Sequence, residues 1–146
     1  MDNESMKKSK SSLISIPLHG DPRGMLSAVE GSDDIPFEIK RVFCIFSCDG
    51  DSVRGKHANR NSEFVMQCIT GECKLTVFEW DGSKNQYFLS SPEQAVYMPT
   101  MTWKEMYDFS EDAVLIVYAS EHFDPDEYIY DYDAFLEEMK KFMWDR

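Results

Sequence analysis

Short apolar runs separated by turn residues extend over most of the chain. β-Branched and aromatic residues concentrate at positions 13–16, 39–46, 64–69, 74–80, 87–89, 96–98 and 113–119. Asp81-Gly82 lies between two of these runs and is a hairpin signal. Many short strands at even spacing favour a sandwich or barrel over alternating strand and helix units.

The C-terminal tail has a helical period instead. An apolar stripe at helical spacing comprises Phe135, Leu136, Met139 and Phe142. Asp133 precedes this stripe, and lysines at positions 140 and 141 lie toward its end, as the helix dipole favours. We therefore predict an all-β fold, a single small β-barrel or jelly roll, with a short C-terminal helix.

The length and composition of the chain fit one domain. A chain of 146 residues is long enough for one buried core and too short for two ordinary domains. A hydrophobic content of 42% favours a packed interior over disorder. We expect residues 1–11, rich in serine and lysine, to form a flexible lead, residues 12–135 the barrel, and residues 136–146 the helical tail.

Net charge and cysteine spacing exclude several classes of protein. A formal net charge of -12 argues against a nucleic-acid partner, which requires a broad excess of lysine and arginine. The four cysteines include no Cys-x2-Cys pair, which gives little support for a structural zinc site. No secretory signal or membrane-spanning apolar run is visible, so we expect a cytoplasmic protein with reduced thiols and no membrane partner.

The run from Arg54 to Glu63 concentrates the candidate chemistry. It holds an imidazole, a carboxylate and two guanidinium groups within ten residues. On a strand, the even separations of His57, Asn59 and Glu63 would direct all three side chains to one face. The spacing His-x-Asn-x3-Glu, followed by Gly71, resembles the first metal motif of the cupin superfamily, whose pattern is His-x-His-x3-Glu on a small β-barrel.

The metal ligands of that superfamily are incomplete in this chain. The second cupin motif corresponds best to Trp103-Lys104-Glu105, where a lysine replaces the expected histidine. Zn²⁺ or Fe²⁺ normally needs about three protein ligands, and only His57 and Glu63 qualify fully. We predict no catalytic metal and no other cofactor.

Five motifs in order make the resemblance more specific. They are DPRGML at 21–26, IPFEIKRV at 35–42, RGKHA at 54–58, WKEMYDFS at 103–110 and DEYIYDY at 126–132. Together they resemble the nucleotide-sugar 3,4-ketoisomerases, cupins that act on dTDP-4-keto-6-deoxyglucose. The resemblance extends from about Leu13 to Phe135.

The resemblance implies an acid-base isomerisation in deoxysugar biosynthesis, such as that of lipopolysaccharide or surface polysaccharide. A base removes the proton on C3 of the sugar, an enediol forms, and a proton returns at C4. His57 is the expected base, because an unperturbed histidine pKa near ~6.5 makes both protonation states accessible. Asn59 stands where the family has a second catalytic histidine, and an amide there is suited to donating a hydrogen bond to an enediolate oxygen.

The resemblance also implies a nucleotide-linked keto-sugar as the partner. Arg54 is expected to bind the diphosphate, a bidentate task that suits guanidinium. The other substrate-binding candidates are Arg23, Lys56, Glu63, Trp103 and Lys104. Each has a plainer alternative: a solvated cation, an ion pair of Glu63 with Arg60 or Lys56, or a core position for Trp103. Lys104 would act as a base only if burial lowered its pKa far below about 10.4.

Three functional classes stay open at this point. The first is the isomerase or a related epimerase, with His57 as the proton carrier. The second is a nucleotide-sugar binder with a degenerate site, because Asn59 does not shuttle protons near neutral pH. The third is a metal-dependent cupin enzyme. The similar ketoisomerases are homodimers that exchange N-terminal strands, so the resemblance further implies a homodimer in which the region around Arg23 contributes to the partner's surface.

Overall fold

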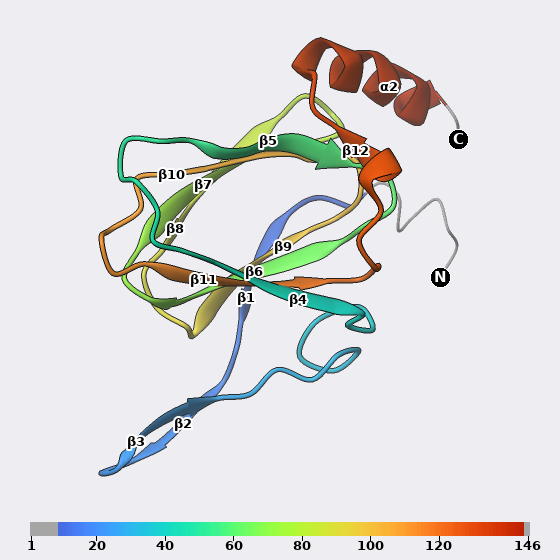
Figure 1. Ribbon diagram of the computed structural model, residues 1–146. Helices are drawn as coiled ribbons and strands as arrows, with labels where there is room; N and C mark the ends of the chain where they lie inside the picture. The colour runs from blue at the N-terminus through green and yellow to red at the C-terminus, as the bar shows by residue number, and fades with distance from the viewer. Residues whose placement is uncertain (1–8, 145–146) are drawn as a thin grey trace.

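The computed structural model describes residues 9–144, which form two five-stranded antiparallel sheets that face each other (Figure 1). The first sheet contains, in spatial order, β1 (Ser12–Ser15), β9 (Gln94–Met98), β6 (Phe64–Thr70), β11 (Val114–Ala119) and β4 (Arg41–Phe46). The second contains β12 (Tyr128–Ile129), β5 (Arg54–Asn59), β10 (Trp103–Tyr107), β7 (Cys73–Phe78) and β8 (Lys84–Leu89). Two short strands, β2 (Leu18–Asp21) and β3 (Gly24–Ser27), form a hairpin that projects away from the two sheets.

The main core lies between the sheets, where every second side chain of each strand points inward. It includes Phe64, Met66 and Cys68 of β6, Leu75 and Val77 of β7, and Leu115 and Val117 of β11. Each such side chain stabilises the fold by roughly 1.5–3 kcal/mol relative to exposure. The alternation that predicts the strands therefore also predicts which residues form this core.

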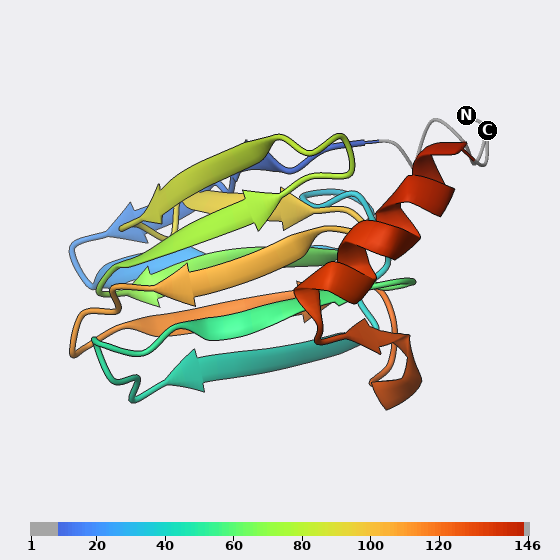
Figure 2. The same cartoon turned by 90° about the horizontal axis from the view of Figure 1, so that it is seen from above.

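Helix α2 (Tyr132–Trp144) covers part of the outer face of the second sheet (Figure 2). Its buried residues Phe135 and Met139 pack against Ala58 and Trp103 of the sheet. The carboxylate of Asp131 accepts a hydrogen bond from the backbone N–H of residue 133 at 2.8 Å and caps the helix start. This cap explains why the helix begins at residue 132, four residues before the predicted tail.

The outer face of the first sheet is covered by irregular chain. Ile16, Ile35 and Phe37 are buried there against Val65 and Ala95 of the sheet. Both outer faces therefore carry apolar cover, and the strands of both sheets are buried on two sides along part of their length. This burial explains why several strands read as continuous apolar runs.

Ser11, the last residue of the predicted N-terminal lead, packs against the second sheet. Residues 1–8 lie outside the described part of the chain. Ser11, however, is buried, and its backbone N–H donates to the Glu79 carboxylate at 3.0 Å. Its hydroxyl also donates to Glu79 and lies 2.7 Å from the hydroxyl of Tyr87. Ser11 therefore belongs to the folded domain.

The predicted fold class, all-β with one C-terminal helix, is confirmed. Within residues 9–144, no helix combines the length and the apolar character needed to cross a membrane.

Candidate active site

A β-bulge in β5 sets the orientation of the candidate residues. Gly55 and His57 pair with consecutive residues of β10, so Lys56 between them is an extra residue. The φ angles of Gly55 and Lys56 are 85° and 55°, both in the left-handed region. Because one residue is added, Arg54 and His57 line the same cavity although they are three positions apart.

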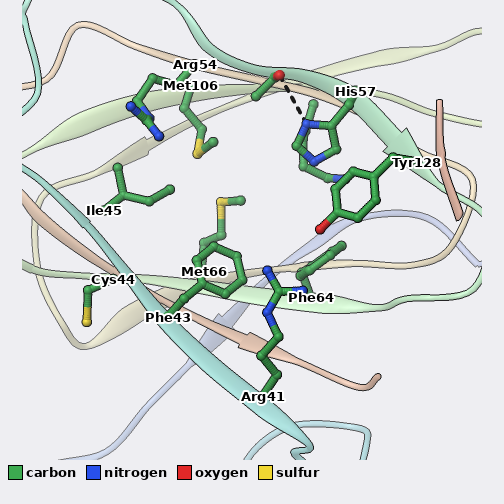
Figure 3. Close-up of a pocket in the computed structure, with 12 residues that line it drawn as sticks. Arg41, Phe43, Cys44, Ile45, Arg54, His57, Phe64, Met66, Met106 and Tyr128 are labelled. Carbon is green, nitrogen blue, oxygen red and sulfur yellow. Dashed lines mark hydrogen bonds between the residues drawn. The ribbon is translucent and has the colours of Figure 1, made fainter. Parts of the chain in front are cut away.

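Gly55 is required by this geometry. A Cβ at this position would lie 2.9 Å from the backbone oxygen of Lys104. The carbonyl oxygen of Gly55 accepts a hydrogen bond from Nδ1 of His57 at 3.0 Å, drawn as the dashed line in Figure 3. This bond fixes the proton of the neutral imidazole on Nδ1 and leaves Nε2 as an acceptor for a ligand.

The bulge borders a cavity of about 300 Å³ between the two sheets, at the lower end of the range for small-molecule sites. Its walls combine apolar side chains with three cations, Arg41, Arg54 and Lys104. Arg41 and Arg54 enter it from opposite sheets (Figure 3). The described lining residues include no aspartate or glutamate, although the chain carries a net charge of -12. The cavity is therefore suited to an anionic ligand.

His57 is held neutral in this cavity. Its ring lies 5.0 Å from the ring of Tyr128 and 5.9 Å from that of Tyr130, measured between centroids. Burial, together with the positive charge of Lys104, lowers the pKa of His57 to about 4. The bond to Gly55 and the charge of Glu127 only partly oppose this. At neutral pH the imidazole is a base with a free Nε2 lone pair.

Lys104 lies opposite His57 in the register of β5 and β10 and is only 2% exposed. Its Nζ donates to Oδ1 of Asn59 at 3.1 Å and lies 4.8 Å from the ring centroid of Phe64. No carboxylate within the described chain forms an ion pair with Lys104 at 4.0 Å or less. Burial lowers the pKa of Lys104 to about 7, opposed in part by the charge of Glu127.

Asn59 lies behind the cavity wall. It is 1% exposed and is not among the residues that line the cavity. Its Oδ1 is occupied by Lys104, whereas its buried Nδ2 has no hydrogen-bond partner in the part of the chain that the structure describes. In this arrangement Asn59 contacts the cavity through Lys104. A direct hydrogen bond to a sugar oxygen, as the sequence predicted, stays a prediction.

Glu127 supplies a negative charge that acts on both His57 and Lys104. It ends the short 3-10 helix η1 (Pro125–Glu127) and is buried. Its carboxylate accepts hydrogen bonds from the backbone N–H groups of Asn61 and Ser62 at 3.1 and 2.8 Å and from the Ser62 hydroxyl at 2.5 Å. These donors stabilise the buried charge and join the end of β5 to the chain before β12.

Arg54 and Lys104 line the cavity with His57, but the other five candidates, Asn59 included, are not among its lining residues. Glu63 does not share a face with His57, because β5 ends at Asn59 and the chain turns before β6. Its carboxylate instead accepts a hydrogen bond from the Tyr97 hydroxyl at 2.6 Å. The ion pair considered for it with Arg60 is absent from the described residues, since Arg60 pairs with Glu138 at 2.6 Å.

Trp103 occupies a core position, which was the alternative to its predicted role in substrate binding. It is buried under α2 beside Phe135, on the face of β10 opposite to Lys104. Its indole N–H donates to the carboxylate of Glu105 at 3.0 Å. Neighbouring residues of a strand point to opposite faces, so Trp103 and Lys104 do not both face the cavity.

The two remaining cations are exposed. Lys56 is the extra residue of the bulge and is not among the lining residues. Arg23 lies at the tip of the β2–β3 hairpin, outside the barrel, and pairs with Asp21 at 2.6 Å (Figure 1). Within one chain neither residue contributes to the cavity.

Sequence reasoning omitted two lining residues of evident interest, Arg41 and Tyr128. The guanidinium of Arg41 lies 4.6 Å from the ring centroid of Phe43 and 5.0 Å from that of Phe123. Arg41, Phe43 and Ile45 alternate along β4 and all line the cavity. That alternation was a usable signal for Arg41; the position of Tyr128 depends on the pairing of β12 with β5 and had no local signal.

A group of three possible metal ligands within the described chain consists of Glu30, Asp33 and Asp34, outside the cavity. Among its described lining residues the cavity offers the imidazole of His57 but no carboxylate, and the thiol of Cys44 at its edge is exposed. That donor set does not fit the histidine and carboxylate pattern of a cupin metal site. The expected absence of a catalytic metal stays a prediction.

Known proteins provide an independent comparison. The family model FdtA, described as WxcM-like, C-terminal, matches residues 9–140. The TDP-4-oxo-6-deoxy-alpha-D-glucose-3,4-oxoisomerase of Aneurinibacillus thermoaerophilus is 41% identical over 122 residues, which are 83% of this chain and 86% of that protein.

Solved structures agree with the sequence match. A histidine-to-asparagine mutant of the 3,4-ketoisomerase QdtA from Thermoanaerobacterium thermosaccharolyticum, in complex with TDP-4-keto-6-deoxyglucose, matches with a TM-score of 0.86 and 36% identity. That match covers 90% of this chain and 95% of the other. The TDP-fucose-3,4-ketoisomerase WlaRA from Campylobacter jejuni matches with a TM-score of 0.84 and 35% identity, over 92% and 98% of the two chains.

Proposed function

Because the chain belongs to the FdtA family of WxcM-like, C-terminal domains, we propose that it is a sugar-nucleotide 3,4-ketoisomerase. Its substrate is a 4-keto-6-deoxy sugar linked to TDP, the nucleotide that the sequence analysis names dTDP. The reaction moves the keto group from C4 to C3. The relatives that are named as 3,4-ketoisomerases support this assignment over the binder and the metal enzyme.

One observation carries the proposal: the cavity places the acceptor atom of a neutral imidazole among cations and away from carboxylates. A keto-sugar linked to a diphosphate has the matching chemistry, an anionic end and a weakly acidic proton next to the ketone. Arg54 and Arg41, entering from opposite sheets, are placed to bind the phosphate oxygens.

His57 then carries the proton that moves between carbon atoms. Nε2 of His57 removes the proton from C3, the electron pair of that C–H bond forms the C3–C4 double bond, and a second acid–base group protonates the C4 oxygen to give the enediol. The imidazolium then returns its proton to C4 while the second group takes the proton of the C3 hydroxyl and the C3 carbonyl forms. Positioned proton transfer of this kind contributes ~10²–10⁴ in rate, and burial in a cationic cavity favours return of the proton from His57.

We extend the proposal to a homodimer. Arg23 lies outside the barrel of its own chain, on a hairpin whose apolar residues Met25 and Leu26 are 69% and 58% exposed. A second copy packed on this hairpin would cover these residues and bring Arg23 toward a neighbouring cavity. The cytoplasm is the proposed location, since it keeps thiols such as the exposed Cys44 reduced. A place in surface polysaccharide or lipopolysaccharide synthesis is part of the same proposal.

The test is proton NMR of TDP-4-keto-6-deoxyglucose in deuterated buffer with the protein. We expect loss of the C3 proton signal and the growth of a 3-keto species. The variant His57→Asn should abolish both while retaining TDP binding by calorimetry. Binding of the keto-sugar by the unaltered protein without exchange or turnover would instead establish a nucleotide-sugar binder.

A further inference from the structure

We propose that Lys104 is the second catalytic residue, the group that moves the oxygen-bound proton of the enediol while His57 moves the carbon-bound proton. This inference rests on the proposed function. It concerns a lysine at the position where the second cupin motif has a histidine, so it applies to this chain.

The position of Lys104 supports such a role. It lies opposite His57 across two paired strands, and both line the cavity from the same sheet. Side chains of directly opposed residues lie about 4.5–5.5 Å apart at Cβ. A sugar that presents C3 to His57 therefore places its neighbouring oxygens within reach of Lys104.

The surroundings of Lys104 favour an exchangeable proton. A buried lysine held by a carboxylate would remain a fixed ammonium, but Lys104 has no such ion pair among the described residues. Its polar partner is the amide of Asn59. An amide has both an acceptor oxygen and a donor nitrogen, and Nδ2 of Asn59 is without a partner in the described chain, so the same side chain can bond either the ammonium or the neutral amine.

The charges around the cavity balance Lys104 between these two forms. Groups that titrate or carry charge and face it from the surrounding elements are His57 and Arg54 of β5, Arg41 of β4, Tyr128 of β12 and Glu127 of η1. Burial lowers the pKa of Lys104 to about 7, and Glu127 partly opposes this. Both forms of the amine are consequently populated near neutral pH.

The two residues give a complete proton balance. As His57 takes the proton from C3, the ammonium of Lys104 donates a proton to the C4 oxygen, and the enediol forms. The neutral amine of Lys104 then takes the proton of the C3 hydroxyl as the C3 carbonyl forms, and His57 returns its proton to C4. Both residues end in their initial protonation states, and no oxidant, reductant or metal is consumed.

The pair also explains how the chain functions without the second family histidine. Asn59, where the resemblance places a second catalytic histidine, and Lys104, where the second cupin motif has a histidine, contact each other. Asn59 does not transfer protons, and we assign it to positioning the amine that does. The proton-carrying group has thus moved from β5 to β10 within the same cavity.

The decisive experiment measures kcat between pH 5.5 and 9.5 for the unaltered protein, Lys104→Met and Lys104→His with TDP-4-keto-6-deoxyglucose. We expect kcat of the unaltered protein to fall above the pH at which Lys104 loses its proton. Lys104→Met should lower kcat at pH 7 by ~10²-fold or more and remove this alkaline limb. Lys104→His should restore part of the rate and move the limb to lower pH.

Binding and folding serve as controls. Methionine fills the space without a buried charge, so the Tm of Lys104→Met should not fall, and its affinity for TDP should change less than ~threefold. Lys74→Met is the matched control, since Lys74 is exposed on β7 and pairs with Asp108 at 3.2 Å outside the cavity. Its kcat and pH profile should be unchanged.

The outcomes separate the two proposals. Turnover by the unaltered protein together with an unchanged kcat and pH limb in Lys104→Met would overturn the role of Lys104 alone. Lys104→Met could also lose rate and keep the alkaline limb, with no recovery of rate in Lys104→His. This result is expected of a residue with a structural role alone, and it would also overturn the role of Lys104. An unaltered protein that binds the keto-sugar but exchanges no proton would overturn the proposed function itself.

Discussion

Lys104 and His57 are direct cross-strand partners in β10 and β5, and the charge of one depresses the proton affinity of the other. Two titratable groups whose environments separate their pKa values, about 4 for His57 and about 7 for Lys104, form an acid and base pair at neutral pH. The base is the weaker proton binder because it is buried beside a cation. This relationship gives the first two predictions below.

Removing the charge of Lys104 should raise the pKa of His57. In Lys104→Met we expect the imidazole to titrate above about 4, but still below about 6.5, since burial is the larger cause of the shift and persists. Proton NMR of the histidine ring signals measures this directly, with the exposed His19 and His122 as internal references. A His57 titration that is identical in both proteins would contradict the coupling.

Lys104 should also make stability depend on pH. Its pKa is about 7 in the folded protein and about 10.4 in the unfolded chain, so between these values the unfolded state binds more protons. The free energy of unfolding contributed by this group therefore rises from pH 7 to about 10, and the full penalty is present below pH 7. Urea unfolding at pH 6 to 10 should show Lys104→Met gaining most over the unaltered protein at the acid end; a constant difference would contradict this.

The bulge should depend on Gly55. In Gly55→Ala, the left-handed φ of 85° and the 2.9 Å approach to the Lys104 carbonyl both oppose a Cβ. We expect a loss of ~2–4 kcal/mol in the free energy of unfolding, measured with urea, and a fall in kcat of ~tenfold or more as His57 loses its position.

Gly82→Ala is the matched control for that variant. Gly82 has the same φ of 85°, but no atom lies within 4 Å of the point that a Cβ would occupy, so this variant bears the backbone strain alone. It should lose about 1 kcal/mol and retain its kcat. Equal losses of stability and activity in the two variants would show that the bulge has no special role.

Arg54 should contribute to nucleotide affinity. Replacing it with methionine removes a cation from a cavity without acidic side chains, and hydrogen bonds to charged groups contribute about 1.5–3 kcal/mol. We expect TDP to bind ~10–100-fold more weakly by calorimetry. Lys140→Met, on the exposed side of α2, should leave the affinity unchanged. Unchanged TDP affinity in Arg54→Met would place the diphosphate elsewhere.

The fold was predictable because local patterns agree with the tertiary structure. Phe64, Met66 and Cys68 alternate into the core, and the stripe containing Phe135 and Met139 packs on the sheet as a helix should. The boundary at Ser11 was missed because its burial depends on Glu79, which is distant in sequence and near in space. Such a polar contact leaves no periodic signal.

The site was predictable only in part for the same reason. His57, Arg54 and Lys104 were found from motifs, and the structure brings them to one cavity. Glu63 was assigned by extending a strand period beyond the end of β5, where the chain turns. Trp103 was wrongly expected to face the substrate, because tertiary packing decides which side of β10 is covered by α2.

The spacing Arg-Gly-x-His at positions 54–57 carries information of its own. Strict alternation would send Arg54 and His57 to opposite faces, so a search for site residues by parity would separate them. Their common orientation depends on one surplus residue, Lys56, that a glycine beside it makes sterically possible. In other chains with the spacing Arg-Gly-x-His, the arginine and the histidine are therefore expected to face the same side of the strand.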